Sequence, residues 1–144
     1  VMNLAFFSCL FMLRRNNEYH ENIEDLSGLS KNHPVLSFSL LIILFSLAGI
    51  PPLAGFFAKF YVFMAVIEQQ MYFLAIIGLL ATVVAAFYYL RIIKVIYFDK
   101  EKGKFETNHH FGLKITLAVS TIFILAYFVY PSWLTEIVSK INII

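Results

Sequence analysis

The chain has 144 residues, of which 60% are hydrophobic and 14% are charged, and its mean hydropathy is +0.79. A soluble domain of this size needs far more charge on its surface, so the composition predicts an integral membrane protein. The single cysteine, Cys9, excludes an intrachain disulfide and a cysteine-based metal site. The net charge of +2 comes from loop residues and gives no indication of a nucleic-acid partner.

Apolar blocks indicate where the chain crosses the bilayer. We predict an all-α fold, a polytopic transmembrane helical bundle in one membrane domain over residues 1–144. Its four spans are expected at about 1–15, 35–67 with an interruption near 49–55, 71–96 and 112–131. The first apolar block has only 13 residues, whereas a span needs about 20. We therefore expect either a truncated chain or the second half of a split polypeptide.

The basic residues indicate how often residues 35–67 cross. If this block crosses once, nine of the eleven basic residues share one side, Lys140 lies alone on the other, and Lys59 is inside the membrane. If it crosses twice, the division becomes four against six. The positive-inside rule favours the single crossing. It predicts that loops 14–34 and 99–112 face the cytoplasm or mitochondrial matrix, with the C-terminus on the opposite, positive side.

The interruption consists of two prolines, Pro51 and Pro52, flanked by Gly49 and Gly55. Proline has no backbone N–H, so the carbonyls of the residues four positions earlier lose their helical partners. In lipid those carbonyls must find another partner. A discontinuous membrane helix is typical of a transport site, and a simple kink packed against a neighbouring helix is the alternative.

Lys59 is the only charged residue between Val35 and Ile67. If Glu68 marks the membrane interface, Lys59 lies roughly 13 Å below it, at about 1.5 Å per residue, which is near the bilayer midplane. An ionisable group at this depth indicates a functional site, and a lysine there could take up and release protons. The alternative is a structural lysine paired with a carboxylate of another subunit.

The remaining polar residues give weaker signals. Tyr88 and Tyr89 could contribute hydroxyls to a water chain, but Arg91 and Lys94 nearby favour an interfacial anchor instead. The four histidines, which lie in polar segments, are better explained as solvated residues than as metal ligands. They are His20, His33, His109 and His110. We find no motif that binds a cofactor or a metal.

Three stretches carry a resemblance to a known family. They are FSLAGIPPLAGFFAKFYVF, the helix ending AFYYLRIIKVIYFD, and the upstream loop ENIEDLSGLSKNHP. Together they resemble the proton-pumping antiporter-like subunits of respiratory complex I, and among these the N-type subunit, which mitochondria call subunit 2. The resemblance covers essentially the whole chain.

The resemblance implies a 14-helix subunit of NADH–quinone oxidoreductase, of which this chain would be the last four helices. Lys59 would belong to the half-channel that passes protons to the positive side of a bacterial inner membrane or, alternatively, a mitochondrial inner membrane. NADH, flavin, iron–sulfur clusters and quinone would bind to partner subunits. A glutamate and two further lysines of the family's proton path lie on helices that this chain lacks. The expected partners are therefore other membrane subunits of complex I, a separate N-terminal half and the lipid bilayer.

Three functional hypotheses follow. The leading one is a proton-conducting piece of complex I, and the second is a membrane scaffold without a proton role. The third is a subunit of a cation/proton antiporter, a class that shares the interrupted helix.

Overall fold

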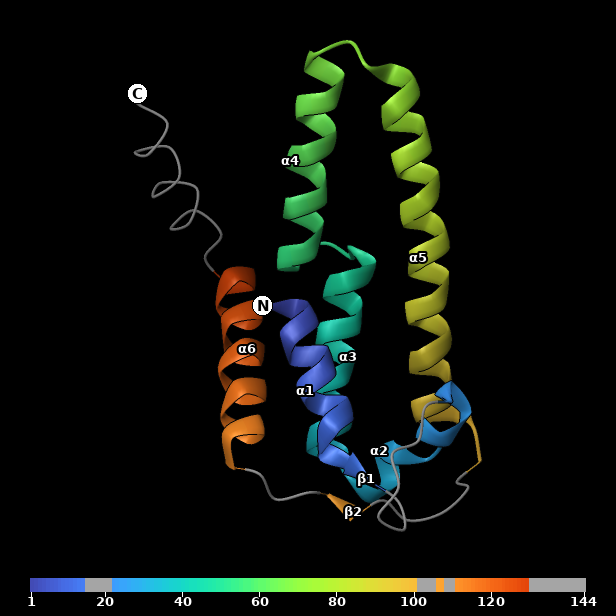
Figure 1. Cartoon of the computed structure of the whole chain (residues 1–144), viewed down its shortest axis with the longest axis vertical. Coiled ribbons are helices and arrows are strands. Elements are labelled where there is room, and N and C mark those ends of the chain that lie inside the picture. Colours follow the sequence, from blue (N-terminus) through green and yellow to red (C-terminus); the bar gives the residue numbers. More distant parts are fainter. Residues whose placement is uncertain (15–21, 101–105, 108–110, 130–144) are drawn as a thin grey trace.

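The computed structural model describes residues 1–14, 22–100, 106–107 and 111–129 (Figure 1). The elements in chain order are α1 (Met2–Met12), β1 (Leu13–Arg14), the short 3-10 helix η1 (Ile23–Leu26), α2 (Leu29–Asn32), α3 (Pro34–Ala48), α4 (Ala54–Glu68), α5 (Tyr72–Phe98), β2 (Glu106–Thr107) and α6 (Phe111–Val129). The prediction of a helical fold is confirmed for these residues. The expected position of the C-terminus, Lys140 and three of the four histidines lie outside them.

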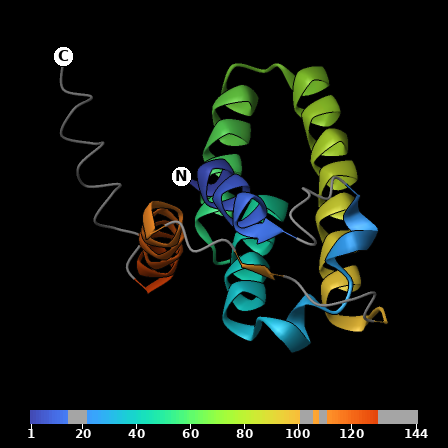
Figure 2. The ribbon, with the colours of Figure 1, turned by 60° about the horizontal axis from the view of Figure 1, so that its bottom comes forward.

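The helices differ in length. Among the described residues, α5 is the one helix long and apolar enough to cross a membrane by itself, while α1, α3 and α6 are apolar but shorter. Helix α4 continues upward from the end of α3, and α5 returns antiparallel beside both (Figure 1). A short turn joins α4 to α5, with Gln70 in the left-handed region at φ 57° (Figures 1 and 2).

Helix α1 ends at Met12, earlier than the expected boundary at residue 15. The following residues, Leu13 and Arg14, are extended and pair antiparallel with β2. A strand of two residues is too short to show an alternation of apolar and polar side chains, so this pair could not be predicted from the sequence.

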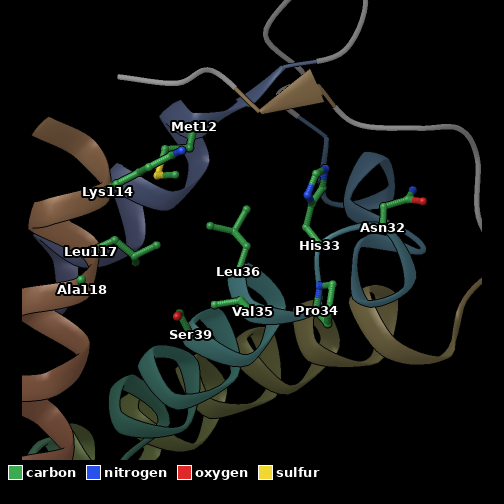
Figure 3. Close-up of a pocket in the computed structure, with 10 residues that line it drawn as sticks. All are labelled: Met12, Asn32, His33, Pro34, Val35, Leu36, Ser39, Lys114, Leu117 and Ala118. Carbon is green, nitrogen blue, oxygen red and sulfur yellow. The ribbon is translucent and has the colours of Figure 1, made fainter. Parts of the chain in front are cut away.

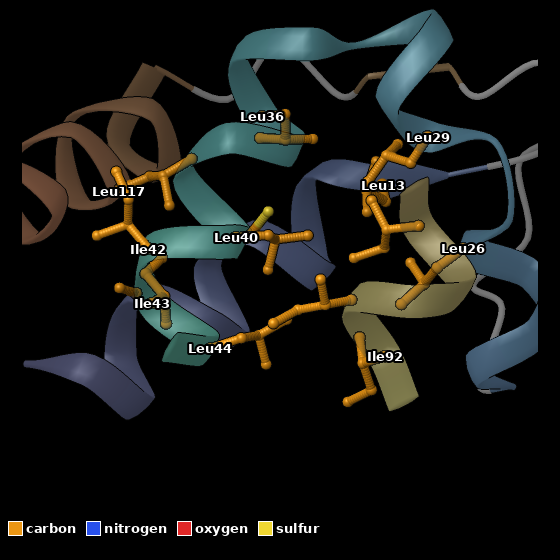
Figure 4. Close-up of a cluster of buried hydrophobic side chains, with 14 of the residues drawn as sticks. Leu13, Leu26, Leu29, Leu36, Leu40, Ile42, Ile43, Leu44, Ile92 and Leu117 are labelled. Atoms are coloured by element: carbon orange, nitrogen blue, oxygen red, sulfur yellow. The ribbon is translucent and has the colours of Figure 1, made fainter. Parts of the chain in front are cut away.

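The buried core lies in the lower half of the molecule as drawn in Figure 1, where α1, α3, α6 and the C-terminal part of α5 meet. Its fully buried side chains include Leu40, Ile43 and Leu44 of α3 (Figure 4). Ile96 of α5 and Ile124 of α6 are fully buried as well. By contrast, α4 and the N-terminal part of α5 extend beyond this core and expose many large apolar side chains. Among the described residues, the closely packed part of the bundle therefore lies beside α3, and α4 with the N-terminal part of α5 projects beyond it.

Candidate functional site

Helix α3 ends in a glycine cap. Gly49 is in the left-handed region at φ 86°, which favours glycine because a Cβ would be strained there. The Gly49 N–H bonds to the Ser46 carbonyl at 3.1 Å, and the Ile50 N–H bonds to the Phe45 carbonyl at 3.1 Å. This is the Schellman arrangement, which ends a helix and reverses the backbone locally. Residues 49–53, here called the helix break, separate α3 from α4.

Two carbonyls at the end of α3 lack helical partners. In a continuous helix, the N–H groups of residues 51 and 52 would bond to the carbonyls of Leu47 and Ala48. Both positions hold proline, which has no N–H to donate. The chemistry of Pro51 and Pro52 therefore leaves two acceptors open at the C-terminal end of α3.

The side chain of Lys59 donates hydrogen bonds to both carbonyls. Its Nζ donates to the Leu47 carbonyl at 2.9 Å and to the Ala48 carbonyl at 3.2 Å. The C-terminal end of a helix carries a partial negative charge, so it stabilises a cation placed there. The ammonium of Lys59 thus lies across the helix break from its own helix, α4.

The two half-helices approach each other closely at Gly55. A Cβ added to Gly55 would overlap the Ser46 carbonyl oxygen and would lie 2.7 Å from its carbon. The Gly55 N–H, one of the unpaired donors at the start of α4, donates to the Ser46 hydroxyl at 3.1 Å. The same hydroxyl donates to the Met2 sulfur of α1 at 2.9 Å. Ser46, which is fully buried, therefore connects three helices at the break.

Lys59 also lines a cavity of about 570 Å³ between α4 and α5. The lining is mostly apolar and aromatic, and consists of Ala48, Gly49, Phe56, Lys59, Phe60, Phe63, Met64, Ile67, Tyr72, Ala75, Ile76, Leu79 and Thr82. The Thr82 hydroxyl donates to the Leu79 carbonyl of its own helix at 2.7 Å. Lys59 is half-buried, and no described carboxylate forms an ion pair with it. Its polar surroundings are backbone carbonyls rather than acidic side chains.

Other candidate residues lie elsewhere. Tyr88 is exposed and Tyr89 packs against the core, and neither lines the Lys59 cavity. Lys94 lies at the end of α5, largely exposed, with Asp99 at 3.8 Å. The structure therefore unites Lys59 with the glycines and prolines of the interruption, but it does not bring the tyrosines to them.

A second cavity, of about 370 Å³, lies between α1, the start of α3 and α6 (Figure 3). His33 and Lys114 line it from opposite sides, above Leu36 and Leu117. Within the described ranges, no group of three or more histidine, cysteine or acidic residues could hold a metal ion. The described chemistry of interest is therefore concentrated at the helix break.

Sequence reasoning did not single out Ser46. A serine in an apolar helix usually bonds back to its own backbone, so its presence carries no signal of a contact across a break. Ser46 and Gly55 are nine residues apart, and a non-helical turn between them removes any fixed periodicity. Only the three-dimensional path of residues 49–53 brings the two together.

An apolar helical chain with an interrupted helix, and with a lysine bonded across the interruption, has the features of a membrane transport protein. The chain belongs to the NADH:quinone oxidoreductase/Mrp antiporter, TM, family, whose model matches residues 1–85.

Three curated relatives are each named NADH-quinone oxidoreductase subunit N. The one from Pelagibacter ubique (strain HTCC1062) is 74% identical over 144 residues, covering 100% of this chain and 31% of the relative. Those from Parvibaculum lavamentivorans and Paramagnetospirillum magneticum are 52% and 47% identical, covering 92% and 91% of this chain, and 27% of each relative. The resemblance to the N-type subunit is confirmed. The chain spans less than a third of the length of these relatives.

Proposed function

We propose that this chain is part of a proton-translocating membrane subunit of NADH:quinone oxidoreductase, and that Lys59 transfers protons in one half-channel. In this proposal α1, α3 with α4, α5 and α6 are four spans of a multi-pass protein in a bacterial inner membrane, with the C-terminus on the positive side. NADH, flavin, iron–sulfur clusters and quinone bind to other subunits of the complex. Those subunits and the remaining helices of the same subunit are its partners.

The observation that carries the proposal is the pair of hydrogen bonds from Lys59 to the end of α3. An ammonium has three N–H donors, and the two carbonyls occupy two of them. The third can pass its proton to a water molecule in the adjacent cavity. In that step one N–H bond breaks, its electron pair stays on the nitrogen, and the proton joins the water oxygen. The neutral amine keeps two N–H groups, so both carbonyls remain bonded in either charge state.

The test is Lys59→Ala in the assembled oxidoreductase. We expect NADH-driven proton pumping to fall at least about a hundredfold, the lower end of the usual contribution of a group that transfers a proton. Assembly should be largely retained, because a half-buried side chain leaves only a small void and water in the adjacent cavity can donate to the two freed carbonyls. Pumping is measured as acidification or alkalinisation of membrane vesicles after NADH addition, normalised to the amount of assembled complex.

Lys94→Ala is the matched control, because Lys94 is a largely exposed lysine at the end of α5. It should pump as the unmodified complex does. Normal pumping by an assembled Lys59→Ala complex would rule out the proton role and favour the scaffold hypothesis. Sodium transport without a requirement for quinone reduction would favour the antiporter hypothesis.

A further inference from the structure

We infer that Ser46 is a positioning residue that holds the helix break in register while the charge on Lys59 changes. The inference rests on the proposed function of Lys59 and adds a second side chain to it. Ser46 does not touch the transferred proton. It acts through the backbone that places Lys59 against the end of α3.

Three hydrogen bonds cross the break among the described residues. Two come from the Lys59 amine to the carbonyls of Leu47 and Ala48, and the third joins the Gly55 N–H to the Ser46 hydroxyl. Ser46 immediately precedes the two acceptor residues on α3. Gly55 lies four residues before Lys59, one helical turn away on the same face of α4. The Ser46–Gly55 bond therefore fixes the spacing between the amine and its acceptors.

The three bonds respond differently to proton transfer. A hydrogen bond from a charged donor is roughly twice as strong as one from a neutral donor. When Lys59 loses its proton, both of its carbonyl bonds weaken, although they can persist. The Ser46–Gly55 bond joins a backbone N–H to a hydroxyl, and neither group titrates near neutral pH. Its share of the connection between α3 and α4 is therefore largest when Lys59 is neutral.

The surroundings of Ser46 suit this role. Its side chain is fully buried, and its O–H donates a hydrogen bond to the Met2 sulfur. The lone pairs of the hydroxyl oxygen are therefore available to accept from other donors. Gly55 permits the short approach because any side chain there would meet the Ser46 backbone. If the hydroxyl is removed, the Gly55 N–H becomes a buried donor without this partner.

Few other titratable groups face this region. Among the described residues that line the cavity beside Lys59, Tyr72 of α5 is the other titratable one. Tyr61 of α4 and Tyr127 of α6 lie outside that lining, with Tyr127 in ring contact with Phe57 at 5.6 Å. No described acidic side chain lines the cavity. Tyr72→Phe, which removes that hydroxyl, is therefore the control for pH dependence. A change in the pumping profile at alkaline pH that persists in this variant does not come from Tyr72.

The test compares Ser46→Ala with Ser37→Ala in the assembled oxidoreductase. Ser37 is equally buried on the same helix, but its hydroxyl has no hydrogen-bond partner among the described residues. For Ser46→Ala we expect proton pumping per NADH to fall roughly fivefold, the factor that one hydrogen bond of ordinary net strength gives. The deficit should grow with rising pH, so the alkaline limb of the pumping profile moves to lower pH. Ser37→Ala should change neither the ratio nor the profile.

Two outcomes would overturn the inference. One is a Ser46→Ala complex that pumps as Ser37→Ala does, and the other is a deficit in Ser46→Ala that is the same at every pH. If Ser46→Ala does not assemble, Ser46→Cys refills the position with a slightly larger thiol, which is only a weak acceptor. That variant should assemble and show a smaller deficit with the same pH trend, and unmodified pumping by it would also overturn the inference.

The result is separable from the test of Lys59. If Lys59→Ala abolishes pumping and Ser46→Ala does not affect it, the proton role stands and the positioning role fails. If Lys59→Ala pumps normally, the proposed function itself fails.

Discussion

Gly55 has no room for a side chain. An added Cβ would overlap the backbone of Ser46, which cannot rotate away as the end of a flexible side chain can. We therefore expect Gly55→Ala to push α4 away from α3 and to lower the stability of the assembled complex by about 1–3 kcal/mol or more, the usual cost of overpacking. Thermal unfolding of the purified complex measures the effect.

Gly112→Ala is the control for this prediction. Gly112 lies in the first turn of α6, and an added Cβ there meets nothing within 4 Å. Alanine is a better helix former than glycine by about 0.5–1 kcal/mol, so this variant should be neutral or slightly stabilised. Equal melting temperatures for the two variants would contradict the close approach at Gly55.

At the same scale, residue chemistry predicted the helix break and singled out Lys59, but it did not predict the contacts between them. A lone lysine in an apolar run and two prolines without N–H groups both follow from residue chemistry, and they pointed to this segment. The partner of Lys59 could not be predicted in this way. Its acceptors are backbone carbonyls 11 and 12 residues away across a non-helical turn, and every residue has a carbonyl. Ser46 was missed for the same reason.

The ends of individual helices could be predicted where one residue dictates the backbone. Helix α3 begins at Pro34, whose missing N–H costs nothing in a first turn, and it ends at Ala48, which is followed by the left-handed cap residue Gly49. The end of α1 could not be predicted, because it depends on a two-residue strand pair with a distant segment. Local chemistry determines caps, whereas pairing between remote segments depends on the whole fold.

The two prolines provide a prediction about these elements. Changing Pro51 and Pro52 to alanine restores the two N–H groups that a continuous helix would direct at Leu47 and Ala48. Each proline in a helix interior costs about 3 kcal/mol, whereas Gly49 there costs only about 1 kcal/mol. We expect the double variant to extend α3 through the helix break and to displace Lys59 from its acceptors.

Amide hydrogen exchange of the assembled complex measures this change. Exchange at residues 49–55 should slow as new backbone hydrogen bonds form, and proton pumping should fall. Pro34→Ala is the control, since the first turn of a helix needs no N–H from that position. An unchanged exchange pattern in the double variant would mean that the Gly49 cap alone maintains the break.

For the whole molecule, the main feature is the unequal burial of α5. Near its C-terminal end, Ile92, Ile93, Val95 and Ile96 pack into the core, whereas most of its earlier side chains, from Tyr72 onward, are exposed in this chain. Its most apolar segment has no buried residue. In lipid, helices associate through van der Waals packing and interhelical hydrogen bonds rather than through the hydrophobic effect, so an apolar helix surface can face either lipid or another helix. The uncovered part of α5 therefore has to meet either lipid or other helices of the assembly.

We expect other polypeptide to cover this part of α5, since the chain spans less than a third of its curated relatives and α4 also exposes large apolar side chains. A photo-crosslinking amino acid in place of Phe87, which is 66% exposed, should link to protein outside this chain in the assembled complex. The same amino acid in place of Ile93, which is 8% exposed, should link only within the chain because its neighbours are core residues. Mass spectrometry identifies the linked peptides. Exclusive linkage of position 87 to lipid would contradict this expectation and would show that this face of α5 lies at the outer surface of the assembly.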